Sequence, residues 1–143
     1  MAHKFANSKF LAAGLATGLL MMSAAPLAAR SLDCSATGNL TQRDMNFCAT
    51  QDFNAADQDL NSAWTSVFSE IKSRDAQKDS DATKGWPAAV LEAQRSWIAF
   101  RDDHCNSVGF AYRGGTIEPL IYQLCRTELT RQRTEQIKGL IDE

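Results

Sequence analysis

Polar side chains interrupt the apolar face of a predicted helix over residues 93–105. At helical spacing, five residues of this segment form one stripe: Gln94, Trp97, Ile98, Arg101 and Cys105. A buried guanidinium that lacks an acidic partner destabilises a fold by several kcal/mol. The sequence should therefore place an acid opposite Arg101. Asp57 and Asn61, four residues apart on a preceding predicted helix, are the candidates.

The polar set formed by Asp57, Asn61, Gln94 and Arg101 has two interpretations. It can be a buried network that fixes the register of two packed helices, or it can be a ligand site. We favour the structural network, because inward-facing polar side chains on packed helices usually satisfy each other. Trp97 lies one turn before Arg101, within reach for stacking, and we include it in the network.

The sequence contains no recognisable catalytic or cofactor motif. His104 is the only histidine after residue 29, and its neighbour Cys105 is expected in a disulfide, which argues against a cysteine–histidine nucleophile. Metal-ligand spacing, phosphate-binding glycine loops and the nucleophile elbow of serine hydrolases are absent. Adjacent acids such as Asp102 and Asp103 do not specify glycosidic chemistry and are typical of a solvated helix face. We therefore expect a non-enzymatic protein without a metal or cofactor.

The first 29 residues have the pattern of a cleaved signal peptide. Two lysines precede an apolar run, residues 10–29, that ends in Pro-Leu-Ala-Ala. A membrane anchor is the alternative, because the run is nearly long enough to span a bilayer, but its small residues favour cleavage after Ala29. Cys34 follows Ser-Leu-Asp and lacks a lipoprotein motif. We expect a periplasmic or secreted protein without a stable membrane anchor.

Residues 30–143 would then be the mature domain, with 13 basic and 17 acidic side chains and a formal charge of −4. This mild acidity and the expected compartment argue against nucleic-acid binding. All four cysteines belong to this domain: Cys34, Cys48, Cys105 and Cys125. An even number of cysteines in an exported chain predicts two disulfides, and the sequence leaves all three pairings open.

Residues 41–74 have the pattern of a first helix. Thr41 can cap its first turn, and Asp44 lies near the positive end of the helix dipole. The expected inward face follows helical spacing: Met45, Cys48, Asp52, Ala56, Leu60, Trp64, Val67 and Ile71.

A charged segment, residues 73–85, separates the first helix from the second. It contains no large apolar side chain and predicts a solvated connection. Pro87 suits a first helical turn, so we expect the second helix to start at Trp86. Its end is expected near Ser107, before Gly109.

A third helix is expected after a flexible corner at Gly114 and Gly115, with Thr116 as its cap, and should continue toward Leu140. Its expected inward face is mostly apolar: Ile117, Leu120, Ile121, Leu124, Cys125, Glu128, Leu129 and Gln132. No strand-like alternation competes anywhere. The sequence predicts an all-α protein, a small antiparallel three-helix fold stapled by two disulfides, with the cysteines of the three helices near one end.

Three segments resemble motifs of the LprI-like lysozyme inhibitor N-terminal domain family of exported bacterial proteins: residues 42–48 (QRDMNFC), 56–61 (ADQDLN) and 93–105 (AQRSWIAFRDDHC). The pattern continues through Gly114, Gly115, Thr116, Cys125, Thr130 and Arg133. The resemblance covers residues 34–133 and implies a protein that binds and inhibits lysozyme. Two features depart from it: Trp64 replaces the usual tyrosine, and the lipid-attachment cysteine of the name-giving lipoprotein has no counterpart.

An acidic surface suits a lysozyme partner, because lysozymes are typically basic and opposite charges speed encounter. The candidate contacts are exposed acids and residues of the corner: Asp102, Asp103, Tyr112, Arg113, Gly114 and Gly115. The alternative function is an envelope module without lysozyme activity, which would bind another protein or a small ligand through the polar set.

Overall fold

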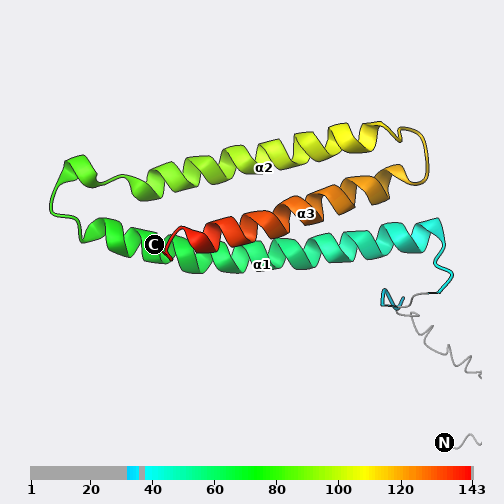
Figure 1. Cartoon of the computed structure of the whole chain (residues 1–143), viewed down its shortest axis with the longest axis horizontal. Helices are drawn as coiled ribbons and strands as arrows, with labels where there is room; N and C mark the ends of the chain where they lie inside the picture. Colours follow the sequence, from blue (N-terminus) through cyan, green and yellow to red (C-terminus); the bar gives the residue numbers. More distant parts are fainter. Residues whose placement is uncertain (1–31, 36–37, 143) are drawn as a thin grey trace, which may run out of the picture. The chain divides into compact units, whose positions relative to one another are not determined.

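The computed structural model describes residues 32–35 and 38–142, and this part of the chain contains three long helices. They are α1 (Gln42–Ala76), α2 (Trp86–Phe110) and α3 (Glu118–Gly139), and a short 3-10 helix, η1 (Asp81–Thr83), lies between α1 and α2. Figure 1 shows that α1 and α3 run in one direction and α2 in the other. The predicted all-α, antiparallel three-helix fold is confirmed. The predicted signal peptide, residues 1–29, lies outside the described residues.

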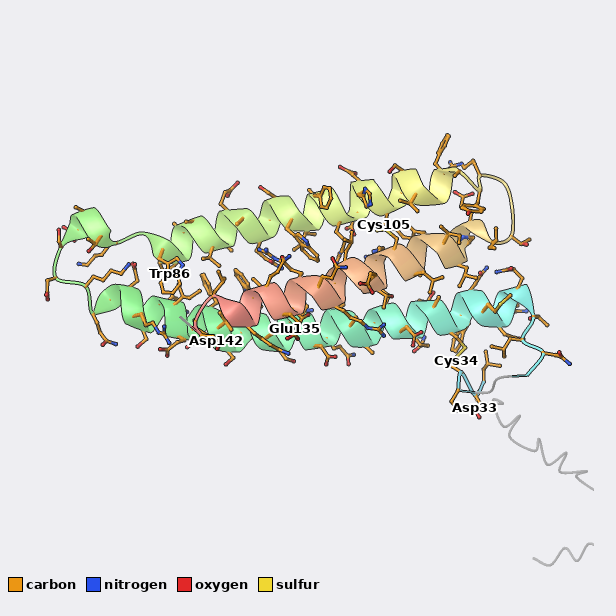
Figure 2. All side chains as sticks on the ribbon, in the orientation of Figure 1. Asp33, Cys34, Trp86, Cys105, Glu135 and Asp142 are labelled. Atoms are coloured by element: carbon orange, nitrogen blue, oxygen red, sulfur yellow. A yellow bond between two sulfur atoms is a disulfide. The ribbon has the colours of Figure 1, made fainter. Side chains whose placement is uncertain are left out.

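Two disulfides, also predicted, join segments near the end at which α1 begins. Cys34 pairs with Cys48, which ties the segment before α1 to its second turn. Cys105 pairs with Cys125, which ties α2 to α3. In Figure 2, Cys34 and Cys105 lie toward this end, and Trp86 lies toward the other. The two bridges therefore restrain one half of the bundle.

The start of α1 is a capping box. The Thr41 hydroxyl accepts a hydrogen bond from the Asp44 backbone N–H at 3.2 Å, and the Asp44 carboxylate accepts from the Thr41 backbone N–H at 3.1 Å. Each side chain thus satisfies a backbone donor that the helix leaves free. The predicted start of this helix at Thr41 is confirmed.

The start of α2 is held by the end of α1. The Asp75 carboxylate accepts hydrogen bonds from the backbone N–H groups of Gly85 and Trp86, both at 3.2 Å. Gly85 has a φ of 116°, a left-handed conformation that favours glycine. Pro87 follows in the first turn, where its missing N–H removes no helical hydrogen bond.

The predicted end of α2 was wrong, because the helix continues through Gly109 to Phe110. A single glycine costs a helix only about 1 kcal/mol. Gly109 is buried, and a Cβ at this position would lie 3.5 Å from the Cβ of Tyr122 in α3. Packing against α3 therefore keeps the last turn of α2 helical.

The predicted cap of α3 was also wrong. Ile117, not Thr116, occupies the cap position, and no side chain caps it. The backbone carbonyl of Thr116 instead accepts a hydrogen bond from the Asn46 side chain at 3.0 Å, which links this turn to α1.

A cluster of apolar side chains fills the half of the bundle farther from the disulfides. Its buried members come from all three long helices: Leu60, Val67, Ile71, Val90 and Ile137. Three tryptophans, Trp64, Trp86 and Trp97, pack against it while partly exposed. Burying these side chains supplies the main apolar driving force for the fold.

The inward faces differ from the predicted ones at several positions. On α1, Phe53 is buried and Asp52 is exposed, and on α2, Ile98 is exposed. On α3 the buried residues are Thr127, Thr130, Thr134 and Ile137, whereas Leu124 is 47% exposed. The hydroxyls of Thr127 and Thr134 donate to backbone carbonyls four residues earlier, at 2.8 and 2.9 Å. With these hydroxyls satisfied, the threonine methyl groups can pack as small apolar groups.

Candidate functional site

A layer of alternating arginine and aromatic side chains extends from the apolar cluster, against which Trp97 packs, to the level of the Cys105–Cys125 disulfide. We call it the arginine–aromatic layer, and its members are Phe53, Trp97, Arg101, Tyr122, Arg126 and Arg133. The Arg126 guanidinium carbon lies 3.6 Å from the Phe53 ring centroid and 5.1 Å from that of Tyr122. The Arg101 carbon lies 5.2 Å from the centroids of both Phe53 and Trp97. Cations over aromatic faces are attracted by the ring quadrupole, and desolvation strengthens that attraction.

Arg101 is the centre of this layer and contacts all three long helices. Its Nη1 lies 3.2 Å from Asp57 Oδ1 of α1 and 3.3 Å from Thr130 Oγ1 of α3. Its Nε donates to Asp102 Oδ1 at 2.9 Å. Asn61 Nδ2 donates to the second oxygen of Asp57 at 3.0 Å. The structure thus brings three members of the predicted polar set together: Asp57, Asn61 and Arg101.

Gln94, the fourth member of the set, has a different partner. It is buried, and its Oε1 accepts a hydrogen bond from Arg133 Nε of α3 at 2.9 Å. The Arg133 guanidinium carbon lies 5.7 Å from the Trp97 ring centroid. Trp97 therefore contacts both Arg133 and Arg101. Burial lowers the pKa of Arg133 from its ordinary value.

Sequence reasoning missed the contribution of α3 to this layer. Arg126, Thr130 and Arg133 all come from α3, whereas partners were sought on α1 and α2. The sequence did contain one indication that α3 contributes to this layer, because Thr130 and Arg133 belong to the family pattern. Arg126 follows Cys125, so its place beside Asp102 depends on the Cys105–Cys125 pairing, which the sequence left open.

The two acids proposed as partner contacts have different environments. Asp102 Oδ1 lies 2.9 Å from Arg101 Nε and 3.2 Å from Arg126 Nε, so its charge is shared between two guanidinium groups. Asp103 is exposed, with no ion pair among the described residues. Of this pair, Asp103 has the carboxylate that is free to meet a partner.

The turn between α2 and α3, residues 111–117, is closed by its own hydrogen bonds. The Glu118 carboxylate accepts from Gly114 N at 3.0 Å and from Arg113 Nη1 at 3.1 Å. Gly115 N donates to the Tyr112 carbonyl at 3.0 Å. Gly114 has a φ of 81°, which glycine adopts without strain. The corner predicted as flexible is therefore an ordered, hydrogen-bonded turn in this structure.

Within residues 32–35 and 38–142, no three His, Cys, Asp or Glu side chains converge as a metal site would require. His104 stacks on Phe100, with ring centroids 5.3 Å apart. In the same part of the chain, no helix combines the length and apolarity needed to cross a bilayer.

Comparison with known proteins identifies the family. The family model described as "Lysozyme inhibitor LprI" matches residues 34–137, most of the chain. The chain belongs to the LprI family. An uncharacterised protein of Rhizobium meliloti (strain 1021) is 38% identical over 133 residues, which are 92% of this chain and 96% of that protein. No solved structure matches significantly. The LprI match spans both disulfides, the arginine–aromatic layer and the α2–α3 turn.

Proposed function

We propose that the mature domain, residues 30–143, is exported and inhibits a lysozyme by binding it. The observation that carries this proposal is the match to the lysozyme inhibitor LprI family over residues 34–137. Two disulfides support the exported location, because disulfides persist in oxidising compartments outside the cytoplasm. Inhibition would result from binding, without a chemical step.

The polar side chains of the interior support a binding protein with a fixed scaffold. Arg101, Arg126 and Arg133 form hydrogen bonds, ion pairs or aromatic contacts with other residues of the bundle. The directional bonds of Arg101 to Asp57 and of Arg133 to Gln94 restrain the relative positions of the three long helices. A surface held in one arrangement loses less conformational entropy on binding.

Electrostatic steering supports a lysozyme as the partner. Residues 30–143 carry a formal charge of −4, and lysozymes are typically basic. Opposite charges raise the association rate, and dissolved salt screens this effect over a distance of about 8 Å at physiological ionic strength. Binding should therefore weaken between low and high salt, mainly through a slower association rate.

A binding experiment tests the proposal. Purified residues 30–143 are titrated against c-type, g-type and i-type lysozymes at low and physiological ionic strength. The proposal predicts a saturable complex with at least one class, with faster association at low salt. If no class binds, the proposal is wrong, and the envelope module that binds another protein or a small ligand becomes the better hypothesis.

Export has its own test. The full chain is expressed in a bacterium with an intact secretion system, and the protein outside the cytoplasm is analysed by intact-mass measurement. Cleavage after Ala29 predicts a chain that starts at Arg30, with both disulfides formed. Retention of residues 1–29 in the cell membrane would favour the anchored alternative.

A further inference from the structure

The end of the bundle formed by the α2–α3 turn exposes several large apolar side chains. Phe110 is 61% exposed and Tyr112 is 45% exposed. Ile117, at the cap position of α3, is also exposed. Figure 1 shows this turn at the end of the bundle where α1 begins, and Asn46 of α1 donates a hydrogen bond to the Thr116 carbonyl. Clusters of exposed apolar residues on a small protein often mark interaction sites, and tyrosine and arginine are enriched among residues that dominate binding energy.

The turn is also held in one conformation before any partner arrives. Glu118 binds both Gly114 N and the Arg113 side chain, and Asn46 of α1 binds the Thr116 carbonyl at 3.0 Å. The Cys105–Cys125 disulfide joins the two helices on either side of the turn. A preformed recognition element avoids much of the entropic cost of ordering a loop on binding.

Arg113 places an exposed guanidinium at this apolar end, and the Glu118 carboxylate balances its charge. Its side chain is 62% exposed although it pairs with Glu118, and its guanidinium carbon lies 5.3 Å from the Phe110 ring centroid. Glu118 and Phe110 therefore orient the guanidinium while leaving much of it open to a partner.

A lysozyme substrate cleft has the complementary chemistry. Glycosidases cleave their substrate between two carboxyl groups, and a cleft that binds a sugar chain offers a groove of polar and apolar groups. We propose that the α2–α3 turn enters the substrate cleft of the lysozyme, with Arg113 facing the catalytic carboxylates and Tyr112 packed against the cleft wall. This inference rests on the proposed function and adds the site and the mode of inhibition: competition with the glycan substrate.

Variants of the turn test this inference in the lysozyme inhibition assay. Arg113→Glu places a negative charge opposite the carboxylates and is expected to raise the half-inhibitory concentration by about 30-fold, the effect of a binding hot spot. Tyr112→Ala is expected to weaken inhibition by about 10-fold while leaving the Arg113–Glu118 pair in place. The matched control is Arg95→Glu, which makes the same charge change at an exposed position on the body of α2.

Each variant is first compared with wild type by circular dichroism and thermal melting. Tyr112→Ala keeps the test decisive if Arg113→Glu disturbs the turn. If both turn variants inhibit as strongly as wild type, or if Arg95→Glu weakens inhibition as much as Arg113→Glu, the turn is not the inhibitory element.

Competition tests the mode of inhibition independently. A β-1,4-linked oligosaccharide of N-acetylglucosamine, which occupies the cleft, is added to the lysozyme before the mature domain. The inference predicts that the apparent Kd for the domain rises linearly with the concentration of free oligosaccharide, by the factor one plus the ratio of that concentration to the oligosaccharide's own Kd. An unchanged Kd would place the contact outside the cleft and overturn the inference while leaving inhibition itself intact. If the wild-type domain binds no lysozyme at all, the proposed function itself is wrong, and this result is distinct from binding outside the cleft.

Discussion

Arg101 of α2 and Asp57 of α1 form an ion pair across the helix interface, with 3.2 Å between Nη1 and Oδ1. The two side chains differ in exposure, because Arg101 is 6% exposed and Asp57 is 38% exposed. The pair therefore connects the interior of the bundle to its surface. Through Thr130, the same guanidinium also contacts α3. One side chain thus links all three long helices.

Removing Arg101 should destabilise the fold. Arg101→Ala deletes the cation shared by Asp57 and Asp102 and leaves a cavity between aromatic rings, so we expect the free energy of unfolding to fall by about 3 kcal/mol. Urea denaturation followed by circular dichroism measures this change. Arg95→Ala, at an exposed position on the same helix, is the control and should change stability by less than about 0.5 kcal/mol. Equal midpoints for Arg101→Ala and wild type would contradict a structural role for the network.

The two disulfides should differ in their accessibility to reductant. Cys105 is completely buried, whereas Cys34 is exposed. Thiol–disulfide exchange requires the attacking thiolate to reach a sulfur atom. Under limiting reductant in native buffer, we expect Cys34–Cys48 to open before Cys105–Cys125. Alkylation followed by peptide mass spectrometry measures the order. Preferential labelling of Cys105 and Cys125 would show that the α2–α3 contact around this disulfide opens more readily than its burial implies.

The capping box should give Asp44 a measurable titration signature. Hydrogen bonds from the Thr41 hydroxyl and backbone N–H lower the Asp44 pKa below its ordinary value of 3.8. A carboxyl whose pKa is lower in the folded state stabilises the fold above its unfolded pKa, and this contribution is lost as pH falls through the folded pKa. In an NMR titration, Thr41→Ala should raise the Asp44 pKa toward 3.8. Thr41→Ser keeps the hydroxyl and should not, so equal shifts in both variants would contradict the hydrogen-bond explanation.

Gly114 should tolerate substitution poorly. Its φ of 81° is a conformation that costs other residues roughly 1–2 kcal/mol. No atom lies within 4 Å of a Cβ built at this position, so the cost of Gly114→Ala is conformational and not steric. We expect a loss of about 1 kcal/mol in thermal or urea unfolding. Gly139→Ala, also without a nearby atom but inside α3, is the matched control and should be neutral or stabilising. A cost at both positions would point to a cause other than backbone conformation.

The helices and their order follow from local patterns in the sequence. Thr41 and Asp44 mark the start of α1, and Pro87 marks the start of α2, because caps and proline act within one turn. Gly109 misled the prediction, since local propensity opposes a helix there by only about 1 kcal/mol and the residue is buried against α3. Such tertiary contacts are not visible in a local pattern.

The buried face of α3 shows why the site was only partly predictable. Threonine counts as polar in a sequence pattern, yet Thr127 and Thr134 satisfy their hydroxyls on their own helix and bury small side chains. The prediction therefore followed large apolar residues such as Leu124, which is exposed. Because the prediction placed the wrong face of α3 inward, it could not assign the α3 residues that complete the arginine–aromatic layer. Asp57 was found because a buried arginine requires an acid, which is a rule of chemistry and not of periodicity.

The most direct test of the central claim is the rate at which a c-type lysozyme clears a suspension of bacterial cell walls in the presence of residues 30–143. The domain is added at increasing molar ratios to a fixed amount of enzyme, with the same domain after reduction and alkylation as the control. If the domain inhibits lysozyme by binding it, clearing slows in proportion to the domain added and approaches complete inhibition near stoichiometric amounts. Unchanged clearing rates with c-type, g-type and i-type lysozymes at a large excess of folded domain would contradict it.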